Sequence, residues 1–172
     1  EHLKSYMNAA DARGVLPMFY LELVSGLRKG ELVALLWDDL NVQDRTISVS
    51  KQYIKNPSGK LTLSRPKTET SVRRVSIPQE AVDLLIQEHE KHPENPYMFP
   101  SSTTGEMYYP DSVVKLHEKI LRDAGLEHIR FHDLRHPNVK PKPKIFLPER
   151  LGLLYVSAGG IIPPLTTAPL LR

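Results

Sequence analysis

A run of apolar residues near the start of the chain constrains the fold more than any other feature. Residues 18–24 are apolar on nearly every side of a helix, with Pro17 before them and Ser25-Gly26 after them. Proline suits the first turn of a helix and glycine suits its end. A helix that is apolar all round is normally buried. The sequence therefore predicts a buried helix in the core.

Other helical and strand patterns surround this run. Residues 46–77 contain segments that alternate with period two, separated by polar turns, and we expect them to form one small antiparallel sheet. Helical spacing and helix-start signals predict further helices at residues 3–13, just after 28, at 79–92 and at 110–124. The expected fold class is α+β, a mainly helical domain with a small antiparallel β-sheet.

Composition narrows the function only weakly. The 172 residues carry a net charge of +3, which permits a nucleic-acid partner without requiring one. The absence of Cys and of any apolar run of membrane-spanning length favours a cytoplasmic protein with no membrane partner. The chain opens inside a helical pattern without a starting Met, so we expect it to be a fragment.

A short basic motif, Phe131-His132-Asp133-Leu134-Arg135-His136, carries the strongest chemical signal. Arginine presents a planar fork that matches phosphate oxygens, and histidine titrates near neutral pH. A His three residues before an Arg, at the start of a helix, places both on one face. The spacing of His132 and His136 also suits zinc, but no third ligand stands in a recognisable pattern, so we expect no metal.

Three motifs in order resemble the catalytic domain of the tyrosine recombinase (phage integrase) family. They are Ser25-Gly26-Leu27-Arg28-Lys29-Gly30-Glu31-Leu32 followed by Leu35-x-Trp37-x-Asp39, then Pro66-Lys67-Thr68-x-x-Ser71-x-Arg73-x-Val75, then His132-Asp133-Leu134-Arg135-His136. The resemblance covers residues 1–136 and is similar to integrases of phages and conjugative transposons of Gram-positive bacteria. It implies a mobile-element protein that breaks and rejoins double-stranded DNA through a phosphotyrosine intermediate, without a cofactor. Other integrase protomers, in a tetrameric synapse on DNA, are the further partners implied.

The resemblance also implies roles for individual residues. Arg28 and Arg135 would grip the scissile phosphate, and Lys67 would be the general acid that protonates the leaving oxygen. His132 would act in proton transfer and phosphate binding, with Glu31 and His136 in support. Other cations compete with Lys67 for its role: Lys60, Arg65, Arg73 and Arg74.

The chain departs from the family after His136. The last 36 residues hold seven of the fifteen prolines and one acid, Glu149. Prolines at this density forbid a regular helix. The nucleophile's expected place falls near Ile162, and Tyr155, the only tyrosine after Arg135, sits too close to Gly152 to match. The nucleophile is therefore unknown.

We divide the chain into an incomplete integrase-like catalytic domain, residues 1–136, and an atypical Pro-rich tail, residues 137–172. Either of two explanations would account for the change: a frameshift in the gene, or an incorrect amino-acid sequence for the tail. Three functions stay open: the catalytic domain of a site-specific recombinase, a catalytically dead DNA-binding remnant, and a basic interaction module with no DNA role.

Overall fold

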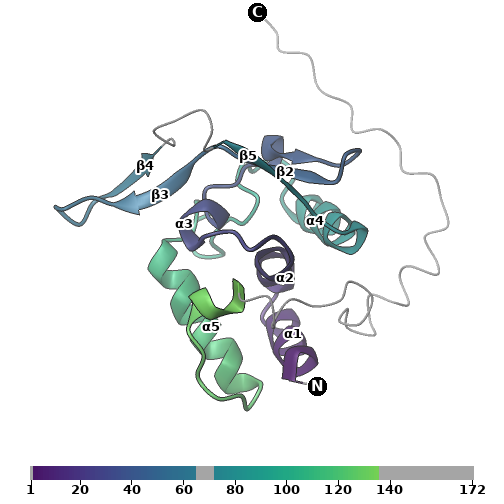
Figure 1. Ribbon diagram of the computed structural model, residues 1–172, viewed down its shortest axis with the longest axis vertical. Coiled ribbons are helices and arrows are strands. Elements are labelled where there is room, and N and C mark those ends of the chain that lie inside the picture. Colours follow the sequence, from purple (N-terminus) through teal and green to yellow (C-terminus); the bar gives the residue numbers. More distant parts are fainter. Residues whose placement is uncertain (1, 65–71, 136–172) are drawn as a thin grey trace, which may run out of the picture.

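The computed structural model describes residues 2–64 and 72–135 and has a mainly helical α+β fold, as predicted (Figure 1). The helical elements in chain order are α1 (His2–Ala12), α2 (Leu16–Ser25), α3 (Lys29–Leu32), η1 (Trp37–Asp39), α4 (Gln79–Lys91), α5 (Pro110–Asp123) and η3 (Phe131–Arg135). The strands are β1 (Leu40–Asn41), β2 (Thr46–Val49), β3 (Gln52–Lys55), β4 (Leu61–Ser64) and β5 (Arg73–Ser76). In the described part of the chain, no helix has the length and apolar character needed to cross a membrane.

Helix α2 is the centre of the core, which confirms the prediction of a buried helix. All residues from Leu16 to Leu23 are buried, and the helix contacts α1, α4 and η3. Pro17 lies in its first turn, and Gly26 ends it with φ of 65° while donating its N–H to the Glu22 carbonyl. That left-handed conformation is the reason for a glycine at this helix end.

The prediction of one sheet over residues 46–77 is wrong, because the strands form two separate sheets. Strands β1, β2 and β5 make a three-stranded antiparallel sheet, while β3 and β4 form a two-stranded hairpin. The break falls at residues 50–51, where the Lys51 ammonium lies 2.6 Å from the Asp39 carboxylate at the end of η1. This ion pair joins residues that are not neighbours in sequence, so the period-two pattern of residues 46–55 does not reveal it.

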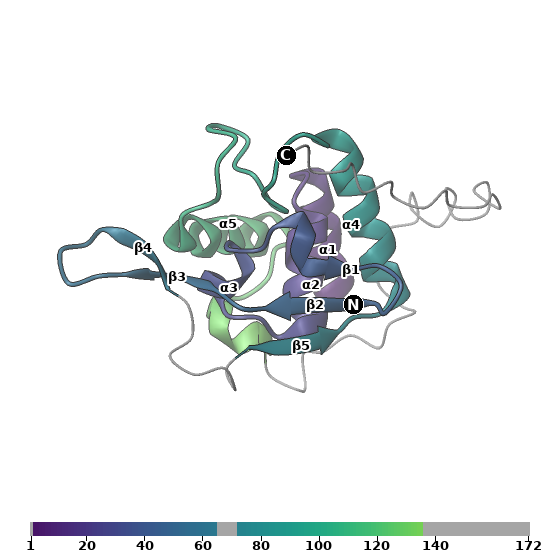
Figure 2. The ribbon, with the colours of Figure 1, turned by 90° about the horizontal axis from the view of Figure 1, so that it is seen from above.

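The β3–β4 hairpin projects from the body of the molecule and is attached at its base (Figure 2). A Cβ atom added to Gly30 of α3 would lie 2.4 Å from the carbonyl oxygen of Tyr53 in β3. Asp111, at the start of α5, accepts hydrogen bonds from Lys29 at 3.0 Å and from Lys55 at 2.9 Å. The hairpin is therefore held to α3 by close backbone packing and to α5 by a shared carboxylate.

A buried histidine connects α1 and α5 to the segment that leads into η3. The Tyr6 hydroxyl donates to His117 Nδ1 at 2.8 Å, and His117 Nε2 donates to the Ile129 carbonyl at 2.9 Å. The carbonyl can only accept, so this partner places the imidazole hydrogen on Nε2. The ring of Phe131, the first residue of η3, lies 5.7 Å from the His117 ring. Burial lowers the pKa of His117, which favours the neutral imidazole.

Candidate functional site

Arg28 stands at the entrance of α3, where the chain leaves the left-handed turn at Gly26. Its backbone is extended, with φ of −73° and ψ of 150°, and its side chain is 61% exposed. Glu31, three residues later, accepts a hydrogen bond from the Arg28 backbone N–H at 2.8 Å. A Glu at the third helical position that bonds back to the N-cap N–H stabilises a helix start. The local sequence thus fixes the backbone of Arg28 and leaves its side chain at the surface.

Glu31 also holds two guanidinium groups. Arg28 Nη1 donates to Oε1 at 3.1 Å, and Arg73 of β5 donates from Nη1 to Oε1 at 2.9 Å and from Nη2 to Oε2 at 2.8 Å. Burial alone would raise the pKa of Glu31, but the hydrogen bonds from Arg73 and Arg28 outweigh it, and the pKa is lowered. The hydrogen bonds to Glu31 raise the pKa of Arg73, which favours its charged form. Glu31 is therefore an ionised anchor beneath Arg28.

The second part of the site is η3, a 3-10 helix of five residues. The sequence predicts the start of a helix here, so the structure differs in the type of helix. Phe131 and Leu134 are buried, while His132 is exposed. A 3-10 helix has three residues per turn, so positions 132 and 135 share a side that differs from the core-facing side. The Arg135 backbone belongs to η3, but its side chain lies outside the described part of the structure, as does the whole of His136.

The salt bridge beside His132 is local to η3 and the residue before it. Arg130 Nε donates to Asp133 Oδ2 at 3.0 Å, and the Asp133 N–H donates to the Arg130 carbonyl at 2.8 Å. The hydrogen bond from Arg130 lowers the pKa of Asp133. Asp133 therefore stabilises the start of η3.

One hollow brings Arg28 and His132 together although they are far apart in the sequence. It is open to solvent, has a volume of about 480 Å³ and is lined by Arg28, Lys29, Val114, Phe131 and His132. Its wall thus joins the entrance of α3, the first half of α5 and η3. A guanidinium and an imidazole at one open hollow can together bind and protonate an oxyanion.

Lys67 lies outside the described residues, between the end of β4 at Ser64 and the start of β5 at Arg73. Four other cations compete with Lys67 for the role of general acid. Arg65 also lies outside the described residues, Lys60 and Arg74 are exposed, and Arg73 is bound to Glu31. The sequence did not reveal the role of Arg73, because its partner lies in a distant segment. Within residues 2–64 and 72–135, no three His, Asp or Glu side chains converge as a metal site would require.

Two solved structures with a similar fold are those of recombinases. The Tn1549 transposon integrase in complex with circular intermediate DNA superposes with a TM-score of 0.66 at 20% identity, over 77% of this chain and 49% of that one. The XerA recombinase superposes with a TM-score of 0.64 at 20% identity, over 78% of this chain and 45% of that one. The fold is that of a tyrosine recombinase catalytic domain.

Sequence comparison leads to the same class. The family model described as the phage integrase family matches residues 2–138, and the chain belongs to this family. It is 30% identical over 151 residues to the ICEBs1 integrase of Bacillus subtilis strain 168 and 25% identical over 158 residues to a XerC-like tyrosine recombinase of Caldanaerobacter subterraneus subsp. tengcongensis. The matches cover 78% and 79% of this chain and 40% of each relative, so the chain spans well under half of their length.

Proposed function

We propose that the chain is the phosphate-binding part of the catalytic domain of a site-specific DNA recombinase, which breaks and rejoins double-stranded DNA through a phosphotyrosine intermediate. The observation that supports this most is the common hollow of Arg28 and His132. Membership of the phage integrase family and the DNA named in the Tn1549 integrase structures point the same way. Activity on bacterial DNA would place the protein in the cytoplasm.

The geometry suits phosphoryl transfer without a metal. Within the described residues, Nη1 is the one atom of the Arg28 guanidinium with a protein partner, so most of its N–H donors face solvent. An arginine fork can bind two phosphate oxygens at once and stabilise the charge that builds up in the transition state. His132 would share this role, Arg135 would supply the second fork and Lys67 would protonate the leaving oxygen. Glu31 would orient Arg28, and His136 would support the site.

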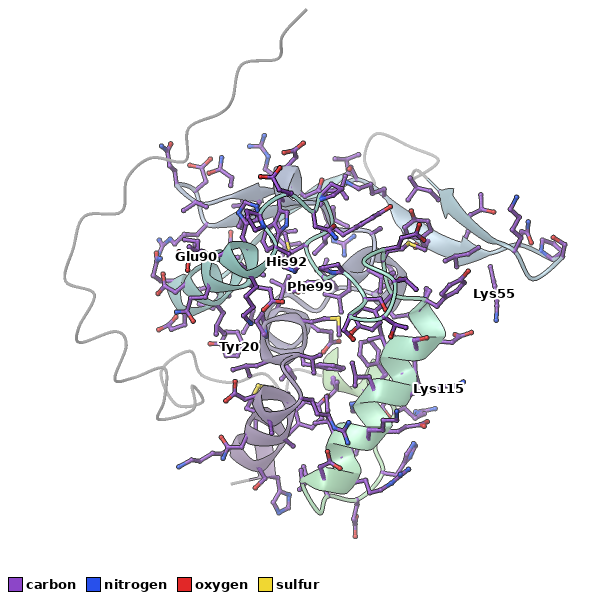
Figure 3. The ribbon with its side chains drawn as sticks, turned by 180° about the vertical axis from the view of Figure 1, so that it is seen from behind. Tyr20, Lys55, Glu90, His92, Phe99 and Lys115 are labelled. Carbon is purple, nitrogen blue, oxygen red and sulfur yellow. The ribbon has the colours of Figure 1, made fainter. Side chains whose placement is uncertain are left out.

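Exposed cations on α5 would add contacts to the DNA backbone. Lys115, Lys119 and Arg122 are exposed on α5 at spacings of four and three residues, which places them on one face of the helix. Figure 3 shows Lys115 of α5 and Lys55 of the hairpin on the opposite side of the molecule from Glu90 of α4. Contacts of this kind are independent of base sequence and weaken steeply as salt displaces them.

Duplex binding tests the proposal first. The affinity for a short duplex should fall linearly with salt on a double-logarithmic plot between about 50 and 200 mM salt. The Arg28→Gln variant should reduce the magnitude of this slope by about 0.9, which is the contribution of one phosphate contact. No binding of duplex even at low salt would contradict the proposal and favour a basic interaction module with no DNA role.

A second candidate is a DNA-binding remnant that grips the phosphate and cannot cut. The sequence favours it in one respect, because no tyrosine stands near Ile162, where the family has its nucleophile. A suicide substrate with a nick beside the cleavage site separates the two candidates. A covalent protein–DNA product supports the recombinase, while slower migration without covalent product supports the remnant. Assembly with other protomers on the DNA, in a tetrameric synapse, belongs to the first candidate only.

A further inference from the structure

The four hydrogen bonds to Glu31 divide its carboxylate between two arginines. Each oxygen accepts one bond from Arg73, at 2.9 and 2.8 Å. The remaining bonds come from Arg28, one from its backbone N–H at 2.8 Å and one from Nη1 at 3.1 Å. An ionised carboxylate offers about four lone-pair sites, so these bonds fill it.

From this arrangement we infer that Arg73 is a positioning residue for Arg28. By occupying one place on each Glu31 oxygen, Arg73 prevents Arg28 from forming a two-pronged pair with Glu31 and keeps the Arg28 fork available for a DNA phosphate. The inference rests on the proposed function, because it concerns the phosphate contact of Arg28.

The competition follows from geometry and charge. Arg28 and Glu31 are three residues apart at a helix start, within reach of a side-chain pair. The Glu31 side chain is 6% exposed, and a buried carboxylate without enough partners is strongly destabilised. If Arg73 were absent, a paired fork-to-fork contact from Arg28 would be the nearest replacement. That contact would turn two Arg28 donors inward and away from a ligand.

Arg73 is well placed for this role because of its position in the chain. It is the first residue of β5, directly after the segment of the chain that contains Lys67. Its pair with Glu31 therefore ties the start of β5 to α3, the element that carries Arg28. Arg74, the next residue, is exposed and has no bond to Glu31, so it provides a matched control.

Salt dependence of duplex binding by the full chain tests the inference. Arg73→Gln should reduce the magnitude of the slope by about 0.9, as Arg28→Gln does. The Arg28→Gln/Arg73→Gln double variant should reduce it no further. The critical variant is Arg73→Gln/Glu31→Gln. Glutamine at 31 keeps an oxygen for the Arg28 backbone N–H but cannot hold the charged fork, so the double variant should have the same slope as Glu31→Gln alone.

The controls separate the other roles of Arg73. Glu31→Gln alone is the reference for the double variant, and Arg74→Gln measures the loss of one exposed cation on the same strand. An unchanged slope in Arg73→Gln, with a lowered unfolding midpoint, would reduce Arg73 to a structural residue and overturn the inference. Two other results would mean that Arg73 contacts phosphate directly, and they would also overturn the inference. The slope of Arg73→Gln/Glu31→Gln could lie below that of Glu31→Gln alone, or the reductions in Arg73→Gln and Arg28→Gln could add in their double variant.

A measurement on the free protein distinguishes failure of this inference from failure of the proposed function. NMR of arginine side chains reports rotation of the Arg28 guanidinium about its Nε–Cζ bond. We expect slower rotation in Arg73→Gln than in the wild-type chain and in Arg74→Gln, because Arg28 becomes bound to Glu31 at two points. If the wild-type chain bound no duplex, the proposed function would fail, and unchanged rotation in Arg73→Gln would separately overturn the role of Arg73.

Discussion

At the scale of single residues, the charge state of Glu31 decides how the site is built. Its carboxylate is buried, and it stabilises the backbone of Arg28 on one side and the start of β5 on the other. Protonation would remove the acceptor for at least one of these donors. The folded state therefore depends on an ionised Glu31.

This dependence predicts a loss of stability in acid. The pKa of Glu31 is lowered in the folded chain, so its contribution is complete above the ordinary glutamate pKa and is lost as the pH falls through the folded value. Urea unfolding of the wild-type chain and of Glu31→Gln should show a large difference in free energy at neutral pH. The difference should shrink as the pH falls below the ordinary glutamate pKa of about 4.3. A difference that stays constant over this range would contradict an ionised Glu31 anchor.

At the scale of elements, the sequence predicts what local patterns control and misses what distant partners control. The burial of α2 and its end at Gly26 follow from the apolar run and the glycine in the local sequence. The division of residues 46–77 into two sheets does not follow from their period-two pattern, and the pair of Lys51 with Asp39 at the break joins segments that are distant in the sequence. The same holds at the site. Arg28 and His132 could be predicted from motifs, whereas the pairing of Arg73 with Glu31 became visible only in the structure.

The packing of α3 on the hairpin gives a second prediction. Alanine is normally favoured over glycine inside a helix by about 1 kcal/mol. At Gly30 the added methyl group would lie 2.4 Å from a backbone oxygen of β3, which cannot rotate away. We expect Gly30→Ala to destabilise the chain by about 1–3 kcal/mol in urea unfolding, the usual cost of overpacking. A stabilised Gly30→Ala variant would show that α3 and β3 are not in close contact.

The link from α1 and α5 to η3 gives a third prediction. Burial lowers the pKa of His117, so the unfolded chain takes up a proton before the folded one does. The stability should therefore fall as the pH drops from about 6.5 toward the folded pKa, by at most about 1.4 kcal/mol per pH unit. His117→Phe should lack this component of the pH dependence, while the exposed His2→Gln should retain it. An unchanged pH dependence in His117→Phe would contradict a neutral His117.

At the scale of the whole molecule, distant segments of the chain meet at one hollow. The core fixes the walls, because α2 contacts η3 and α3 contacts both α5 and β3. Only Arg28 and His132 of the predicted catalytic set have side chains within the described structure, and both line this hollow. The convergence of Lys67 and Arg135 on the same place is a prediction.

Arginine at the second phosphate position should be essential for the reaction and dispensable for the fold. Arg135→Ala should abolish covalent product on a nicked suicide substrate, because one of the two forks that stabilise the transition state is lost. Its circular dichroism spectrum and unfolding midpoint should stay close to those of the wild-type chain. Normal cleavage by Arg135→Ala would show that the site lies elsewhere.

The most direct test of the central claim is a crystal structure of the chain bound to duplex DNA. We expect a single backbone phosphate in the hollow, with its oxygens within hydrogen-bonding distance of the Arg28 guanidinium and the His132 imidazole. Arg135 and Lys67 should reach the same phosphate. A complex in which Arg28 and His132 contact different phosphates, or in which the DNA lies on another face of the molecule, would contradict the claim.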